Sequence, residues 1–366
     1  MKKLVIIGAN EFQNRLIIKA KALGYETHVF AWKCGDVGEE TADFFYPVSI
    51  VEKQSILEEC RRIQPSGICS IASDLASITV NYVADKLGLT CNPSEITGRC
   101  TNKYEMRKCL KKAGLPTPGF CRTDSVNEQV KALNFPLIVK PTDRSGSRSI
   151  TKVYNEKELE NAILRAVSDS FEKQAIVEEY IPGDEYSFEC ISYGGTHHYL
   201  SVTKKYTTGE PNFIETGHAE PAGLSEEMVA AVTDVVFRAL DALGVKNGAS
   251  HSEFRIDENG VIRIIEIGAR MGGDCIGSDL VPLSTGYDYV KMVIDVACGK
   301  APELIRISTP KKARIYFIFN EQDLVQFETV KAKHPEKIYR SEIAKKRSDF
   351  YDSSSRWGYY ILAESV

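Results

Sequence analysis

Two glutamates in a predicted β-hairpin are the residues best suited to chemistry. The apolar pattern over 251–256 and 261–267 predicts two strands joined by a tight turn. A two-residue loop would pair Glu253 with Ile264, so that Glu253 and Glu266 become diagonal neighbours on one face. Two carboxylates so placed suit a hard cation that prefers oxygen ligands and also holds phosphate, as Mg²⁺ does. The alternative is a pair of solvated charges on a sheet face, and a one-residue change of register would separate them.

A glycine-rich turn with one arginine follows the second of these strands. Residues 268–274 read Gly-Ala-Arg-Met-Gly-Gly-Asp, with Arg270 in the third place. An arginine in such a turn is well placed for bidentate contact with a carboxylate or a phosphate. Since Glu266 also lies between two isoleucines, we interpret the hairpin and its turn as functional rather than as a solvated edge.

A lysine and a Gly/Ser-rich loop form a second candidate site. A predicted strand ends at Lys140, and residues 143–149 follow it as a loop of small and polar residues. Backbone N–H groups and hydroxyls of Ser145, Gly146 and Ser147 can close over phosphate oxygens, while the lysine supplies a point charge. The loop is not a Walker A motif, and taken alone it is equally well explained as a solvated hairpin loop.

A third candidate is an apolar strand that breaks at a Pro-Gly pair. The predicted strand 175–179 is followed by Pro182-Gly183, after which an extended pattern resumes. Backbone groups at a strand end can pair with the edge of adenine, and a carboxylate past the break can accept both ribose hydroxyls. Taken alone, the segment is better explained as a strand–turn–strand connection with acidic residues facing solvent.

The elements that must position these residues differ between the start and the middle of the chain. Short apolar runs alternate with helical patterns over about the first 95 residues, which predicts βαβα units and a parallel sheet in a small Rossmann-like domain. Gly8 is the single glycine where a dinucleotide fingerprint needs three. NAD binding is therefore not expected there.

The rest of the chain has an α+β pattern. Strands in hairpins alternate with single long helices, predicted at 226–243 and 287–298. We expect an α/β and α+β chain with a Rossmann-like domain over 1–95, a two-lobed central domain over 96–305 and a small C-terminal subdomain over 306–366.

Composition and charge exclude several classes of protein. The 366 residues include 46 Lys and Arg against 50 Asp and Glu, for a formal charge of -4, without long blocks of like charge. This balance argues against binding to nucleic acid or to a membrane surface. The 10 cysteines form no CxxC pair, so neither a disulfide framework nor a zinc site is expected. No apolar stretch reaches the roughly 20 residues of a membrane span, and no signal peptide is recognised, so we expect a cytoplasmic protein.

In their order along the chain, these features resemble the ATP-grasp superfamily. They are Lys103, Lys140 with its loop, the segment 178–185, Glu253, and Glu266 with Arg270. The likeness covers about residues 1–310 and is closest to the L-amino acid ligase branch, with a more distant likeness to carbamoyl-phosphate synthetase domains and to purine-pathway carboxylases. The segments 213–218 and 266–274 carry the closer likeness.

The resemblance implies that the central domain binds ATP with Mg²⁺, or with Mn²⁺ in its place. Lys103 and Lys140 become phosphate ligands, and residues 143–149 become a flap over the triphosphate. Glu253 and Glu266 would hold the metal ion.

The nucleoside end of ATP would lie on the third candidate segment. The resemblance places the adenine amino group on Glu178, the ring edge on the backbone of Glu179 and Ile181, and the ribose on Glu185. One departure from the family pattern is Gly268, where many members have an asparagine after the second metal ligand, and it leaves the number of metal ions open.

The implied activity is that of an ADP-forming ligase, which activates a small carboxylic acid as an acyl phosphate and joins it to an amine. Lys140 and Arg270 are then the expected catalytic residues, with Arg270 steadying the transferred phosphoryl group or the acyl phosphate. The alternatives are a carboxylase or carbamoyl-phosphate-type synthetase acting through carboxyphosphate, and a catalytically silent nucleotide-binding regulator. A homodimer is left open.

The acid substrate is expected near Arg270. Polar selection would come from the loop at 215–218, with His218, and from Ser73 and Asp74, which follow a strand of the first domain where α/β sheets present ligands. A surface position is an equally good interpretation of His218.

Overall fold

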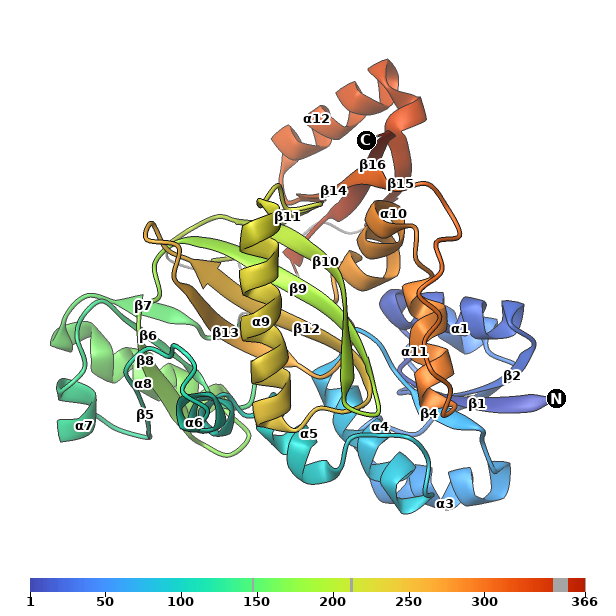
Figure 1. The fold of residues 1–366 in the computed structure, drawn as a ribbon, viewed down its shortest axis with the longest axis horizontal. Helices are drawn as coiled ribbons and strands as arrows, with labels where there is room; N and C mark the ends of the chain where they lie inside the picture. Colours follow the sequence, from blue (N-terminus) through green and yellow to red (C-terminus); the bar gives the residue numbers. More distant parts are fainter. Residues whose placement is uncertain (147, 211–212, 345–354, 366) are drawn as a thin grey trace.

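Three β-sheets and the helices packed on them make up the protein (Figure 1). The computed structural model describes residues 1–146, 148–210, 213–344 and 355–365, so the predicted site residue Ser147 lies outside the described residues. Within these ranges, no helix combines the length and the apolar character that crossing a bilayer requires.

The first sheet is parallel and four-stranded, as the alternating pattern predicts. Its order is β3-β2-β1-β4, with β1 (Lys2–Ile7), β2 (Tyr25–Phe30), β3 (Phe44–Tyr46) and β4 (Gly67–Cys69). The helices of this region are α1 (Glu11–Ala22), α2 (Val37–Thr41), α3 (Lys53–Ile63) and α4 (Asp74–Lys86). Leu4 to Ile7 of β1 are fully buried, which is typical of a parallel strand covered on both faces.

The second sheet is antiparallel and carries the Gly/Ser-rich loop. Its order is β5-β8-β6-β7, with β5 (Phe120–Thr123), β6 (Leu137–Pro141), β7 (Thr151–Val153) and β8 (Ala175–Glu179). Helix α8 (Glu156–Asp169) packs on it through an apolar stripe that includes Leu159 and Ile163, and the short α7 (Glu128–Lys131) follows β5. The loop between β6 and β7 is the predicted flap.

Two helices lead from the first sheet to the second, namely α5 (Ser94–Thr101) and α6 (Lys103–Lys112). The Asn102 side chain accepts hydrogen bonds from the backbone N–H groups of Tyr104 and Glu105, so α6 begins at Lys103. This cap fixes the position from which the Lys103 side chain enters the site.

The third sheet has eight strands in the order β13-β12-β9-β10-β11-β14-β16-β15. Its central strands are β9 (Asp184–Tyr193), β10 (Thr196–Thr207), β11 (Glu215–Glu220), β12 (Gly248–Ile256) and β13 (Ile262–Gly268). Figure 1 shows α9 (Glu226–Leu243) lying along one face of these strands. Helix α11 (Tyr289–Ala297) contacts both this sheet and β4 of the first sheet, and it follows the π-helix η1 (Ile276–Leu280) and α10 (Val281–Thr285).

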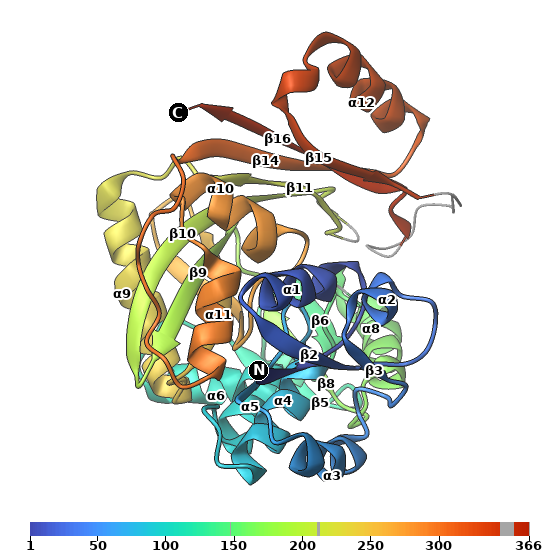
Figure 2. The same ribbon diagram turned by 90° about the vertical axis from the view of Figure 1, so that its right-hand side faces the viewer.

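The C-terminal strands continue the third sheet rather than forming a separate one. β14 (Lys311–Ile318) pairs with β11, β16 (Gly358–Ser365) pairs with β14, and β15 (Ile338–Ile343) closes the edge. Helix α12 (Glu321–Lys333) buries Phe327 against them, and η2 (Pro335–Lys337) follows it (Figure 2). The sheet thus runs across the predicted boundary at residue 306, and the division into three domains stays a prediction.

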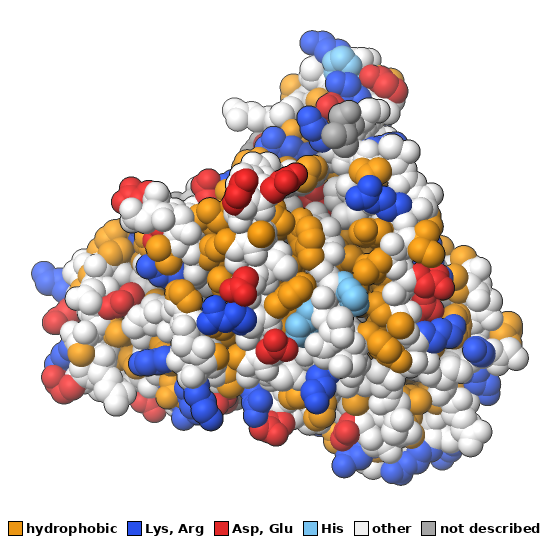
Figure 3. All heavy atoms as spheres, viewed as in Figure 1, with side chains coloured by type: hydrophobic (Ala, Val, Ile, Leu, Met, Phe, Trp, Pro, Cys, Tyr) orange, Lys and Arg blue, Asp and Glu red, His pale blue; other side chains and the backbone are white. Residues whose placement is uncertain are grey.

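Charged side chains are dispersed on the face drawn in Figure 3. Lysines and arginines alternate there with acidic residues, without a broad area of one sign. This agrees with the near balance of 46 basic and 50 acidic residues in the chain.

Candidate active site

A cavity of about 300 Å³ lies between the second and third sheets. β6 and β8 supply one wall, and β10, β12 and β13 supply the other. The predicted site residues that line it are Asp74, Lys103, Lys140, Ser145, Gly146, Glu178, Glu179, Ile181, Glu185, His218, Glu253, Glu266 and Arg270. Ser73 is not among them, because its hydroxyl caps α4 by accepting from the backbone N–H of Ala76 at 3.2 Å. The structure shows this capping role for Ser73, and its contact with a substrate stays a prediction.

Glu253 and Glu266 lie directly opposite each other on β12 and β13. The prediction that Glu253 pairs with Ile264 is wrong, because Phe254 pairs with Ile264 and a bulge leaves Ile265 without an opposite residue. Directly opposed residues of an antiparallel pair have Cβ atoms roughly 4.5 to 5.5 Å apart on the same face. The bulge therefore brings the two carboxylates closer than the predicted diagonal relation would.

Lys205 of β10 is a buried cation beside Glu253. Its Nζ lies 2.5 Å from Oε1 of Glu253, 3.3 Å from Oε1 of Glu185 and 3.7 Å from Oε1 of Glu215. Burial alone would lower the pKa of Lys205, but the three carboxylates raise it well above its ordinary value. Burial alone would raise the pKa of Glu253, and Lys205 with His251 lowers it well below its ordinary value. Both groups are therefore charged at neutral pH.

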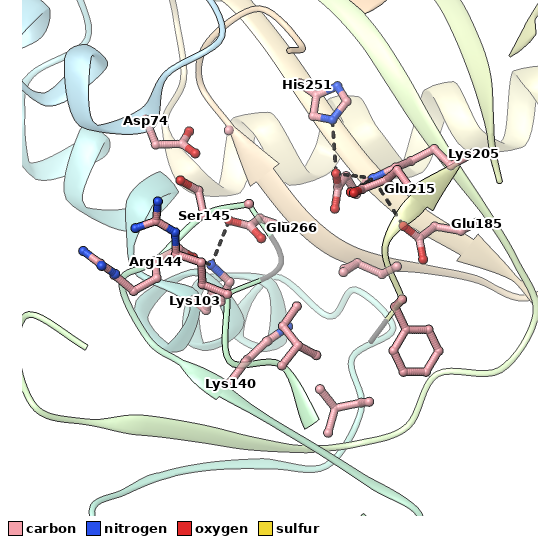
Figure 4. Close-up of a pocket in the computed structure, with 18 of the residues that line it drawn as sticks. Asp74, Lys103, Lys140, Arg144, Ser145, Glu185, Lys205, Glu215, His251 and Glu266 are labelled. Carbon is pink, nitrogen blue, oxygen red and sulfur yellow. Dashed lines mark hydrogen bonds and ion pairs between the residues drawn. The ribbon is translucent and has the colours of Figure 1, made fainter. Parts of the chain in front are cut away.

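Lys103 connects the flap to the second glutamate. Its Nζ donates to Oε1 of Glu266 at 3.0 Å and to the backbone oxygen of Arg144 at 2.5 Å. Figure 4 shows Glu266 between Lys103 on one side and the group around Lys205 on the other. Each of the two glutamates thus has a lysine at hydrogen-bonding distance.

Lys140, Glu178 and Arg107 form a buried cluster at the floor of the cavity. Oε2 of Glu178 lies 2.7 Å from Nζ of Lys140, and Oε1 accepts from Nε of Arg107. Burial would raise the pKa of Glu178, but Arg107 and Lys140 outweigh it and lower the pKa to about 2. Burial is the main cause that lowers the pKa of Lys140. The Glu178 carboxylate opposes this effect, while the positive charges of Arg107 and Lys103 lower the pKa further. Both Glu178 oxygens are thus engaged by cations, and the contact with an adenine amino group stays a prediction.

His251 and Glu189 support Glu253 from behind. Nδ1 of His251 contacts Oε1 of Glu189, and its Nε2 lies 3.2 Å from Oε1 of Glu253. Burial would lower the pKa of His251, but Glu189 and Glu253 raise it to about 9. The imidazole is therefore a cation that bridges two carboxylates at neutral pH.

The segment predicted for the nucleoside is held by Arg255. Its guanidinium donates to Oε2 of Glu185 at 2.8 and 3.2 Å, and to the backbone oxygen of Ile181 at 2.8 Å. The N–H of Glu179 donates to the backbone oxygen of Gly119 at 2.9 Å. Apolar side chains complete this end of the cavity: Ile138, Tyr180, Ile181, Phe213 and Ile265.

Asp74 and Arg270, both predicted to contact the acid substrate, bind each other. Nε and Nη2 of Arg270 donate to the two oxygens of Asp74 at 2.8 and 3.1 Å. Burial would lower the pKa of Arg270, but Asp74 outweighs it and raises the pKa above its ordinary value. A Cβ on Gly268 would lie 3.1 Å from Oδ1 of Asp74 and 3.2 Å from Cζ of Arg270. The departure from asparagine at this position therefore makes room for the ion pair.

His218 is buried in strand β11, so the predictions of a loop at 215–218 and of a surface histidine are wrong. Its ring packs edge-on against Phe317, and its Nε2 lies 3.7 Å from Oδ2 of Asp274. Burial lowers the pKa of His218, and Asp274 offsets this only in part. The imidazole is therefore mainly neutral at pH 7 and lines the cavity as predicted.

The charges of the cavity fit a triphosphate with a divalent cation. Four basic side chains line it, namely Lys103, Lys140, Arg144 and Arg148, and the two opposed glutamates offer oxygen ligands. Among the described residues, no three His, Cys, Asp or Glu side chains are grouped closely enough to hold a metal by themselves. Mg²⁺ is commonly bound by one or two protein carboxylates, while substrate phosphates and water supply its other ligands.

The sequence analysis did not single out Lys205, Arg107, His251 or Asp274 as site residues. Lys205 and His251 lie in strands, and Arg107 lies in a helix, without a local motif around them. Lys205 follows Thr203 and Lys204, and His251 lies between two serines, so their neighbours give no local signal of a buried charge. The sequence therefore does not reveal which carboxylates these side chains will meet.

Comparisons with known proteins agree with this geometry. A model of the ATP-grasp domain matches residues 133–279. The D-alanine–D-alanine ligase of Lacticaseibacillus casei is 28% identical over 221 residues, covering 56% of this chain and 58% of that protein. The alanine–anticapsin ligase of Bacillus subtilis is 24% identical over 306 residues, covering 74% of this chain and 64% of that protein. The matched parts thus span less than two thirds of either relative.

The fold is also that of a solved structure. The L-amino acid ligase from Bacillus licheniformis superposes with a TM-score of 0.84 at 24% identity, covering 100% of this chain and 94% of that one. The likeness extends over all three sheets and so includes the first, parallel sheet as well as the cavity. Residues 133–279 are thus an ATP-grasp domain, and the chain as a whole has the fold of the L-amino acid ligase structure.

Proposed function

We propose that the protein is an ATP-dependent ligase that joins a small carboxylic acid to an amine and releases ADP and phosphate. The observation that carries this proposal is the opposition of Glu253 and Glu266 in a cavity that also holds Lys103 and Lys140. Oxygen ligands for a divalent cation and cations for phosphate oxygens are the two requirements of phosphoryl transfer from ATP.

The chemistry follows from the poor reactivity of a carboxylate, whose charge is delocalised and whose oxygen is a poor leaving group. The carboxylate attacks the γ-phosphorus of ATP, a carboxylate O–P bond forms, and the bond to ADP breaks. The amine, after losing one proton to solvent, attacks the carbonyl carbon of the acyl phosphate. A C–N bond forms, the C–O bond breaks, and phosphate leaves with the second amine proton as HPO₄²⁻.

The phosphate end of ATP is assigned to three cationic groups. Lys140, held by Glu178, and Lys103, at the start of α6, bind phosphate oxygens, and the flap residue Arg144 approaches from the other side. Lys205 holds Glu253 by an ion pair of 2.5 Å. Glu253 and Glu266 are the residues that would hold Mg²⁺, which neutralises phosphate charge when it is bound.

The acid end is assigned to Arg270. Asp74 fixes its guanidinium by two hydrogen bonds, and Nη1 donates to the backbone oxygen of Met271 at 3.3 Å. Arg270 steadies the transferred group, and Asp74 acts as a positioning residue for it. A cytoplasmic location and a homodimer stay predictions.

An ADP-release assay over pairs of amino acids and small carboxylic acids tests the proposal. We expect release to require both an acid and an amine, and to fall by about 100-fold or more in Glu253→Gln. Glu258→Gln in the exposed turn of the same hairpin is the matched control, and it should behave like the parent protein. ADP release with bicarbonate as the only acid would instead favour the carboxylase alternative, and ATP binding without turnover on any pair would favour the regulator.

A further inference from the structure

One of the two carboxylate oxygens of Glu253 is held by neighbouring side chains (Figure 4). Nζ of Lys205 lies 2.5 Å from Oε1 of Glu253, and Nε2 of His251 lies 3.2 Å from the same atom. Both hydrogen bonds that this carboxylate accepts within the described structure therefore go to Oε1. Oε2 is the oxygen left for another ligand.

Glu266 repeats this pattern on the opposite strand. Its Oε1 accepts a hydrogen bond from Nζ of Lys103 at 3.0 Å, which is the one hydrogen bond to its carboxylate from the described part of the chain. The two opposed glutamates thus offer one oxygen each. A carboxylate with one oxygen held in this way does not bind a metal ion through both oxygens.

His251 is fixed from its other side by Glu189. The two residues lie directly opposite each other on β12 and β9, and Nδ1 of His251 contacts Oε1 of Glu189. The hydroxyl of Ser187 donates to the same oxygen of Glu189 at 3.2 Å. Glu189 is fully buried and His251 is 6% exposed, so water competes little for these contacts.

Gly272 makes room for these two side chains. A Cβ on Gly272 would lie 2.8 Å from Nδ1 of His251 and 3.1 Å from Oε2 of Glu189, so a larger residue would displace them. A Cβ on the neighbouring Gly273 would meet Cβ of Ala72 at 3.6 Å, which is an ordinary contact. Of the two consecutive glycines, Gly272 is the one that the packing of His251 and Glu189 requires.

We propose that Glu189 and His251 make the metal site selective for a small divalent cation, Mg²⁺ or Mn²⁺, against Ca²⁺. His251 holds Oε1 of Glu253 and so restricts this carboxylate to one metal-binding oxygen. Glu189 acts as a positioning residue, through His251. The inference rests on the proposed function, which assigns the metal ion to Glu253 and Glu266.

The two kinds of cation differ in how they use carboxylates. Ca²⁺ takes about six to eight oxygen ligands in a flexible geometry and often binds both oxygens of one carboxylate. Mg²⁺ demands a near-octahedral arrangement and is commonly bound by one or two carboxylates, with phosphates and water as its other ligands. Two carboxylates that offer one oxygen each therefore suit Mg²⁺ and deprive Ca²⁺ of ligands.

Lys205 alone does not impose this restriction. Its ammonium group also lies 3.3 Å from Oε1 of Glu185 and 3.7 Å from Oε1 of Glu215, and its flexible stem lets it follow any of its carboxylate partners. The histidine ring, by contrast, uses one nitrogen on Glu189 and the other on Glu253. Its position is therefore set by the sheet.

Calorimetry with a non-hydrolysable ATP analogue measures the metal preference without turnover. The affinity of the full chain for the analogue is determined with Mg²⁺, with Ca²⁺ and with EDTA. In the parent protein, the Mg²⁺ complex should bind about tenfold or more tightly than the Ca²⁺ complex. Gly272→Ala should reduce this preference to about twofold or less, because the new methyl group displaces His251. Gly273→Ala is the matched control and should keep the preference of the parent protein.

Two substitutions of His251 separate its two contacts. An asparagine amide lies near the position of Nδ1 and can keep the contact with Glu189, whereas the longer glutamine reaches toward the position of Nε2 and hence Glu253. Both variants lose the imidazole, so their difference isolates the contact with Glu253. His251→Asn should lose the preference for Mg²⁺, and His251→Gln should retain most of it. The thermal midpoint and the affinity in EDTA, which should not change, check that each variant is folded.

The inference is overturned if the parent protein, Gly272→Ala and His251→Asn show the same preference for Mg²⁺ over Ca²⁺. Equal losses in the two glycine variants, or in the two variants of His251, would also contradict it, because the loss would not follow the contact with Glu253.

The outcomes separate this inference from the proposed function. The expected preferences without ADP release on any pair of substrates would keep the role of Glu189 and His251 and contradict the ligase activity. Metal-dependent ADP release with unchanged preferences in the variants would keep the ligase activity and contradict this role. A parent protein that binds the analogue equally well with Mg²⁺ and with EDTA would contradict both the metal assignment and this inference.

Discussion

Asp74, the first residue of α4, holds Arg270 by two hydrogen bonds of 2.8 and 3.1 Å, although the two residues lie 196 positions apart. The pair joins the first, parallel sheet to the glycine-rich turn after β13. The proposed acid site at Arg270 therefore needs Asp74, which begins a helix packed on the first sheet, as well as the nucleotide-binding part of the chain.

Asp74→Asn should lower kcat by about tenfold to 100-fold while ATP affinity changes little. The amide cannot accept both guanidinium hydrogen bonds, so Arg270 loses its fixed orientation next to the acid. Steady-state kinetics and calorimetry with ATP measure the two quantities. Asp85→Asn, at an exposed position of the same helix, is the control. An equal loss of ATP affinity would assign Arg270 to the nucleotide instead.

Lys140→Ala should weaken ATP binding by about tenfold to 100-fold, because a buried cation at the predicted phosphate site is removed. Glu178 keeps Arg107 as its partner in this variant, so the core should remain folded. Calorimetry with ATP and Mg²⁺ makes the measurement, and Lys157→Ala on the exposed side of α8 provides the comparison. If Lys140→Ala binds ATP like the parent protein, Lys140 does not belong to the phosphate site.

The hairpins and the positions of most site residues could be predicted from the sequence because their signals are local. The hairpin of β12 and β13 and the helix 226–243 lie where the pattern predicts them. The register of β12 against β13 could not be predicted in the same way. It depends on a bulge at Ile265, whose backbone oxygen accepts from Arg107 at 2.9 Å, a contact between residues far apart in the chain.

Long-range pairing also explains what the sequence analysis missed at the C-terminus. β14 joins β11 through pairs such as Gly217 with Tyr316, and a Cβ on Gly217 would lie 2.5 Å from the backbone oxygen of Ile315. A glycine there allows the close approach of the two strands. Neither segment contains a local signal for its partner, so the sequence suggested a loop at 215–218 and a separate subdomain.

The stability of the protein should depend on the protonation of Glu220. Its carboxyl group is buried among Thr203 and Ser284, and burial raises its pKa from 4.5 to about 7. Since the folded state binds this proton more tightly, its contribution to the free energy of unfolding is largest below pH 4.5. That contribution falls as the pH rises from about 4.5 to 7 and is constant above this range.

Glu220→Gln removes this titration while keeping the shape of the side chain. From pH 5 to pH 8, the free energy of unfolding of the parent protein should fall by about 1 to 3 kcal/mol more than that of the variant. Urea unfolding at the two pH values gives the difference. A difference between variant and parent that does not change with pH would show that Glu220 does not titrate with a raised pKa.

The most direct test of the account follows the oxygen atoms of the acid substrate. A carboxylic acid labelled with ¹⁸O is turned over with ATP and an amine that support ADP release, and the phosphate product is examined by mass spectrometry or by ³¹P NMR. Activation as an acyl phosphate predicts that each amide formed is accompanied by one phosphate that carries one ¹⁸O atom, with ADP as the other product. Unlabelled phosphate, or release of AMP and pyrophosphate, would contradict phosphoryl transfer to the carboxylate and with it the proposed function.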